Sequence, residues 1–217
     1  MRTRTFIIAC ALILAILLFA DRRPNSAQQD RYSHIVDLTG EQNSSGLRTI
    51  YAPDSQTRIV APAALIPGTW GAGQIPAERL VAPLVVINLK PSPESAPISL
   101  DDIAAWESSH GMVPQGAVVA IRRTSAGSRS SNAVPITADA AQFLMDARYT
   151  LGFAIETTAD LTSDRTLARQ LALHGNYVVE GTAGLSSLPP TGSLVIVAPV
   201  KNKNSTEAPV RVLAMVR

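Results

Sequence analysis

Apolar and polar positions divide residues 34–217 into runs of distinct character. Short continuous runs of Val, Ile and Leu indicate strands, and residues 84–89 (LVVINL) give the clearest example, as expected of a strand covered on both faces. Proline and glycine dominate residues 67–73 and forbid regular structure there. The predicted strands are residues 34–39, 58–61, 84–89, 117–121, 152–155, 177–180, 194–200 and 210–216.

Three helices are predicted between these strands, in residues 99–111, 137–149 and 163–175. Ser99 opens the first helix because its hydroxyl can accept a bond from an otherwise unpaired backbone N–H, and Asp102 favours the positive end of the helix dipole. Strands alternate with helices in the middle of the chain, while strands dominate both ends. The pattern therefore predicts an α/β fold, but not a simple doubly wound sheet.

Residues 1–28 differ in character from the rest. Residues 1–5 carry two arginines, and residues 6–20 form an unbroken apolar run of 15 residues. As a helix this run rises about 22 Å, which is short of the ~30 Å hydrocarbon core of a membrane. Such a start is typical of a signal peptide, with cleavage points open at Ala20 and at Ala27. We expect export to the periplasm or the extracellular space; the alternative is an uncleaved N-terminal anchor.

Composition narrows the classes of function. A chain of 217 residues suits one domain plus a leader. Its single cysteine, Cys10, excludes an internal disulfide framework and a multi-cysteine zinc site. The net charge of +2 comes from the leader, since the residues after 28 hold 15 basic and 16 acidic side chains. This balance does not favour nucleic acid as a partner, and membrane contact is expected only through an uncleaved leader.

Common signatures of catalysis are missing from the sequence. It has no H-E-x-x-H, no G-x-S-x-G and no phosphate-binding loop. His110 and His174 each precede a glycine at a predicted helix end, where a histidine interacts favourably with the helix dipole. His34 lies at the start of the first strand, and we expect it to be exposed. The histidines therefore predict structural roles rather than an active site.

Eight short stretches occur in a fixed order along residues 34–217. They are VDLT at 36–39, QIPAERLVAPLVVI at 74–87, ISLDDIAAWE at 98–107, HGMVPQGA at 110–117, GFAIET at 152–157, VEG at 179–181, LPPTG at 188–192 and APVR at 208–211. The ordered set resembles the bacterial cyclase family, which includes kynurenine formamidase and isatin hydrolase. The resemblance implies one cyclase-like domain over residues 34–217, with the swivelling β/β/α architecture: a mixed sheet with helices packed on it, usually in an oligomer.

Active members of this family bind one or two divalent metals, commonly zinc or manganese, through the signature H-x-G-T-H-x-D-A-P-x-H-F. Residues 54–65 (DSQTRIVAPAAL) match it in order and keep Thr57, Ala61 and Pro62. The functional positions of the signature carry other residues: Asp54 and Arg58 replace two metal-binding histidines, Val60 replaces the ligand aspartate, and Ala64 replaces the histidine that serves as acid and base.

The resemblance also assigns functional residues of the family to three positions outside the signature. The family's histidine in H-x-x-L-L is Ala168, and the histidine after the first D-L-[ST] is Gly40, whereas the glutamate ligand is kept as Glu180. A hydrolytic metal site needs about three protein ligands. Because Val60 and Ala168 have no atom to donate, we expect no metal cofactor.

Arg58 brings a permanent positive charge to the place of a dication's ligand. Its guanidinium can fill the vacated volume and pair with Asp54 or Glu180, and an unpaired Glu180 in the same pocket would be costly. We therefore predict an Arg58–Glu180 contact of salt-bridge length. The alternative for Glu180 is a solvated carboxylate at the end of a strand.

Two functions follow from the resemblance. The first is an exported, non-catalytic member of the family, a pseudoenzyme that serves as a binding or interaction module for a small molecule or for another copy of the chain. The alternative is a metal-dependent amidohydrolase of the arylformamidase type, acting on N-formylkynurenine, with an altered site. Its ligands would come from Asp54, Glu156, Glu180 and either Asp160 or Asp164, and such oxygen ligands favour magnesium, calcium or manganese over zinc.

Overall fold

The computed structural model describes residues 32–40, 57–89, 97–123, 136–156 and 164–217. Within it, His34–Arg217 forms one unit of the fold. None of the helices in these ranges has the length and apolar character needed to cross a membrane. The predicted leader, residues 1–28, lies outside the described residues.

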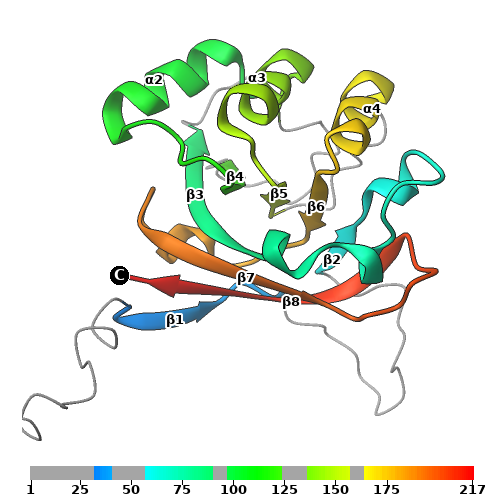
Figure 1. Cartoon of the computed structure of the whole chain (residues 1–217). Helices are drawn as coiled ribbons and strands as arrows, with labels where there is room; N and C mark the ends of the chain where they lie inside the picture. Colours follow the sequence, from blue (N-terminus) through cyan, green and yellow to red (C-terminus); the bar gives the residue numbers. More distant parts are fainter. Residues whose placement is uncertain (1–31, 41–56, 90–96, 124–135, 157–163) are drawn as a thin grey trace, which may run out of the picture. The chain divides into compact units, whose positions relative to one another are not determined.

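Four parallel strands form the centre of the sheet, since a helix crosses over between each strand and the next. In chain order these elements are β3 (Val81–Leu89), α2 (Leu100–His110), β4 (Val118–Arg123), α3 (Ala138–Arg148), β5 (Gly152–Ile155), α4 (Arg165–Leu173) and β6 (Tyr177–Glu180). The strands lie side by side in the order β3, β4, β5, β6. The three helices cover one face of these strands (Figure 1).

The remaining described strands run antiparallel and close the sheet into a barrel. They are β1 (His34–Asp37), β2 (Arg58–Val60), β7 (Ser193–Pro199) and β8 (Glu207–Val216). β7 pairs with β3 on one side and with β8 on the other. The other edge of β8 pairs with β2 near its start and with β1 near its end, and β2 pairs in turn with β6. The three-residue strand β2 therefore closes the ring of strands.

The two faces of the barrel wall form two separate cores, because side chains alternate along a strand. The inner core contains Ile59 of β2, Tyr177 of β6 and side chains from each of the remaining strands of the ring, β3, β4, β5, β7 and β8. The outer core lies between the wall and the helices and contains Val60 of β2, Ile103 of α2 and Leu171 of α4. The mixed α/β sheet with helices packed on it, as predicted, is confirmed.

Side-chain caps begin all three helices. At α2 the Asp102 backbone N–H donates to Ser99 Oγ (3.2 Å), and the Ser99 backbone N–H donates to Asp102 Oδ2 (2.9 Å). This reciprocal arrangement satisfies backbone groups that the first turn leaves unpaired. Thr137 caps α3, and Asp164 caps α4 by accepting two backbone N–H bonds. The predicted helices are confirmed, with Asp164 supplying the cap expected near residues 163–165.

His110 and His174 have contacts that suit a structural role. The Nδ1 atom of each lies within 3.0 Å of the carbonyl oxygen four positions earlier, in the last turn of its own helix. His174 Nε2 also lies 2.8 Å from Asp146 Oδ1, which joins the end of α4 to α3. His34 is exposed on β1, as expected. His110 and His174 thus hold helix ends, as the sequence predicts.

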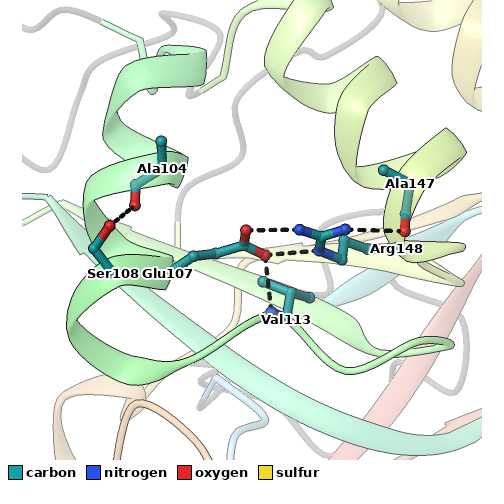
Figure 2. Close-up of polar contacts among 6 residues, drawn as sticks. All are labelled: Ala104, Glu107, Ser108, Val113, Ala147 and Arg148. Carbon is teal, nitrogen blue, oxygen red and sulfur yellow. Dashed lines mark hydrogen bonds and ion pairs between the residues drawn. The ribbon is translucent and has the colours of Figure 1, made fainter.

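An ion pair between Glu107 and Arg148 joins the ends of α2 and α3. Figure 2 shows two parallel bonds, from Arg148 Nε to Glu107 Oε1 (2.7 Å) and from Arg148 Nη2 to Glu107 Oε2 (2.8 Å). The Val113 backbone N–H also donates to Glu107 Oε1 (2.9 Å). The hydrogen bonds from Arg148 are the largest of the effects that lower the pKa of Glu107. The same hydrogen bonds raise the pKa of Arg148.

Replacing Glu107 should therefore weaken the fold in a pH-dependent way. We expect Glu107→Gln to lower the free energy of unfolding by about 1–3 kcal/mol at neutral pH, because it removes a largely buried charge-assisted pair. The lowered pKa means that this stabilisation is fully present above the unfolded-state pKa of about 4.3 and is lost as the pH falls through the folded-state value. Urea unfolding at pH 7 and pH 3 measures the difference.

The exposed Asp101, in the first turn of the same helix, supplies the control. Asp101→Asn should cost less than about 0.5 kcal/mol. A Glu107→Gln protein that differs from wild type no more than this control at pH 7, or whose deficit grows in acid, would contradict the assignment.

Candidate functional site

The carboxyl ends of parallel strands are where α/β sheets commonly place their ligand sites. Glu180 is the last residue of β6, and Arg58, the first residue of antiparallel β2, lies directly opposite it in the ladder. Both side chains lie on the face that carries the helices, because Val60 and Val178, two positions along each strand, belong to the outer core. The fold itself thus brings two residues 122 positions apart to one place.

The Arg58 guanidinium contacts the Glu180 carboxylate directly. Arg58 Nε donates to Glu180 Oε2 (2.9 Å), and Arg58 Nη2 lies 2.7 Å from the same oxygen. Only 3% of the Glu180 side chain is exposed, against 36% of the Arg58 side chain. The salt-bridge contact that the sequence predicts is therefore present, and Glu180 is a buried carboxylate rather than a solvated one.

A second carboxylate approaches Arg58 from the other neighbouring strand. Arg58 Nη1 lies 3.6 Å from Glu207 Oε2 at the start of β8. Glu207 is about half exposed, so this contact is screened by water and is individually weak. The guanidinium nevertheless lies between carboxylates of β6 and β8, the two strands that flank β2. Sequence reasoning missed Glu207, because no local pattern indicates that β2 and β8 are neighbours.

The Thr57 hydroxyl holds the backbone around this ion pair. Gly40 N–H donates to Thr57 Oγ1 (2.7 Å), and Thr57 Oγ1 donates to the Gly181 carbonyl (2.7 Å). Thr57 is buried beside Arg58, and Gly181 follows Glu180 in the chain. One hydroxyl thus links three segments at the carboxyl edge: the residues after β1, the start of β2 and the end of β6.

Three more positions that the resemblance assigns to the site, Val60, Ala64 and Ala168, carry hydrocarbon side chains. Val60 is buried in the outer core, together with Leu167 and Leu171 of α4. Ala168, also on α4, is buried, whereas Ala64 is exposed at the end of a 3-10 helix, Pro62–Ala64, that contacts α4.

Glu156 and Asp164, two acidic residues of the alternative metal site, have separate roles. Glu156, just after β5, lies 3.8 Å from Arg122 Nε, and burial raises its pKa against the opposing effect of that arginine. Asp164 is occupied as the cap of α4. Asp54 and Asp160 lie outside the described residues. Among the described residues, no three His, Cys, Asp or Glu side chains gather closely enough to hold a metal ion.

The family model described as "Putative cyclase" matches residues 28–159, more than half of the chain. The chain belongs to the cyclase family. The ordered stretches that suggested this family in the sequence run through β3, α2 and β5.

Solved structures of family members share the fold. Isatin hydrolase A from Labrenzia aggregata, bound to benzyl benzoate, is 28% identical over 84% of this chain and 93% of that chain, with a TM-score of 0.67. Isatin hydrolase A from Ralstonia solanacearum is 23% identical over 85% and 92%, with a TM-score of 0.67. A potential metal-dependent hydrolase with cyclase activity is 21% identical over 85% and 98%, with a TM-score of 0.66. A comparison with curated proteins gave no match.

The positions that the resemblance assigns to the metal, so far as they lie among the described residues, do not fit a hydrolytic metal ion. Of the family's ligand positions, Arg58 is a cation, Val60 and Ala168 are hydrocarbon, and Glu180 is a carboxylate already in contact with Arg58. A catalytic zinc or manganese ion needs about three donor atoms from the protein. These four positions supply one donor residue and one charge that repels the ion.

Thr57 gives a direct test of the backbone frame. Thr57→Val keeps the shape of the side chain but removes the hydroxyl, which leaves the Gly40 N–H and the Gly181 carbonyl without that partner. We expect the free energy of unfolding to fall by about 1–3 kcal/mol in urea titrations. Thr57→Ser, which keeps the hydroxyl, should retain most of the stability. Equal stability of Thr57→Val and wild type would show that these two bonds contribute little.

Proposed function

We propose that this chain is a non-catalytic member of the cyclase family, an exported protein in which the hydrolase site has become a binding or interaction module. The observation that supports the proposal is the contact between Arg58 and Glu180 at two positions where the family holds its metal. The partner is a small molecule in the remodelled site or another copy of the chain. Export rests on residues 1–28, which have the pattern of a signal peptide.

Electrostatics explains why this contact opposes catalysis. A dication about 4 Å from the guanidinium would be repelled by roughly 8 kcal/mol at an effective dielectric constant of ~20. Moving the Arg58 side chain into solvent would remove this repulsion. Val60 and Ala168 would still offer no ligand to the metal. The polarised water that a metal hydrolase uses as its nucleophile therefore has no support from these positions.

Hydrolysis stays the second candidate because of one specific likeness. Isatin hydrolase A from Labrenzia aggregata matches 84% of this chain at 28% identity. An active enzyme of this kind would hydrolyse an amide such as N-formylkynurenine or the cyclic amide of isatin. It would need metal ligands other than the described positions of the family site.

Metal content and turnover separate the two functions. We expect purified protein, incubated with zinc or manganese and then desalted, to keep less than about 0.1 equivalent of either metal, because a site with one donor residue binds a dication weakly. Assays with N-formylkynurenine and isatin should stay at the background rate. Mass spectrometry of bound metal and absorbance assays measure both quantities.

A restored variant supplies the positive control. Arg58→His, Val60→Asp, Ala64→His and Ala168→His in one chain return the residue types that the resemblance assigns to these positions, and we expect this variant to retain more metal than wild type. About one equivalent of metal in the wild-type protein, together with turnover that a chelator abolishes, would overturn the proposal in favour of a hydrolase.

A further inference from the structure

The closure of the barrel depends on a very short strand. β2 has three residues, yet it is the strand between β6 and β8 that completes the ring. A strand of this length forms few ladder hydrogen bonds with either neighbour. Side chains that tie β2 to both neighbours therefore matter more here than on a long strand.

The Arg58 guanidinium is placed to supply such a tie. Its Nε and Nη2 atoms face Glu180 Oε2 on β6 at 2.9 and 2.7 Å, and its Nη1 atom faces Glu207 Oε2 on β8 at 3.6 Å. A positive group with carboxylates on two sides has the arrangement of a bound cation and its anionic ligands. The difference is that this cation is covalently attached to the strand it holds.

We propose that the Arg58 guanidinium is a built-in cation that takes the place of a bound ion at this edge, satisfies the buried Glu180 carboxylate and holds β2 in the barrel. Removing the side chain then leaves a site for a guanidinium ion between Glu180 and Glu207. This inference rests on the proposed function in one respect, since both require that Glu180 pairs with Arg58 rather than with a metal.

The proposal predicts chemical rescue of a defined variant. Arg58→Ala leaves the buried Glu180 without this counter-charge, and we expect the Tm to fall by about 10 °C. Guanidinium chloride at about 20 mM, far below the concentrations that unfold proteins, should bind the folded variant and restore several degrees. Sodium chloride at the same concentration should restore much less, because sodium has no planar hydrogen-bond donors.

Two further variants keep the test sharp. The double variant Arg58→Ala/Glu180→Gln removes both charges of the pair and leaves no buried carboxylate, so it should be more stable than Arg58→Ala alone and should not respond to guanidinium. The matched control is Arg211→Ala, which removes an exposed ion pair between Arg211 Nη2 of β8 and Asp37 Oδ2 of β1 (2.6 Å). It should change the Tm by no more than about 2 °C and show no rescue.

The results separate this inference from the proposed function. Equal responses of Arg58→Ala and Arg211→Ala to guanidinium, or an Arg58→Ala protein as stable as wild type, would overturn the built-in cation. Stoichiometric metal and turnover in the wild-type protein would overturn the proposed function instead. If Arg58→Ala fails to fold in buffer, refolding it in guanidinium chloride and in sodium chloride, each at about 20 mM, decides the question, because folding in guanidinium alone supports the built-in cation and folding in neither contradicts it.

Discussion

The contact between Arg58 and Glu180 is the interaction on which the carboxyl edge of this barrel depends. It joins residues 122 positions apart, so it forms only when β2 and β6 are already neighbours. Because Glu180 is buried, loss of this contact would be costly: a buried carboxylate without a counter-charge costs several kcal/mol. Thr57 places its hydroxyl beside the same strand ends, and together these side chains hold the start of β2 against the end of β6.

Scaffold and site differ in how closely they follow the family. The stretches that resemble the family include parts of β1, β3, α2, β5, β6 and β8, and the solved relatives share the fold. Of the positions that the resemblance assigns to the metal site, Arg58 lies at the edge of the barrel, whereas Val60 and Ala168 are buried apolar side chains. A fold can therefore persist while the chemistry at its edge changes. In the function that we propose, hydrocarbon and a fixed cation take the place of metal ligands, and the same barrel accommodates both.

The sequence pattern predicted the elements whose ends are determined by neighbouring residues. Strands β5 and β6 begin and end at the predicted residues, and the cap at Ser99 places α2 correctly. β3 begins at Val81, three residues before the predicted start, because this part pairs with β7 although Pro83 has no N–H to donate. β8 likewise begins early, at Glu207, since it pairs there with β2. Both early starts depend on pairing with strands that are distant in the sequence, and a short stretch of sequence does not reveal such pairing.

The same limit applies to the site. The pairing of Arg58 with Glu180 could be predicted because the resemblance placed both at one metal site. Glu207, and the pair of Arg122 with Glu156, could not be predicted, because their partners are set by barrel closure and strand order.

A crystal structure determined after soaking in manganese salt, with anomalous diffraction recorded at a wavelength that reveals manganese, tests the central claim most directly. The account predicts that Arg58 stays within hydrogen-bond distance of Glu180 and that no anomalous peak appears between β2 and β6. A manganese ion bound to Glu180, with the Arg58 side chain displaced, would contradict it.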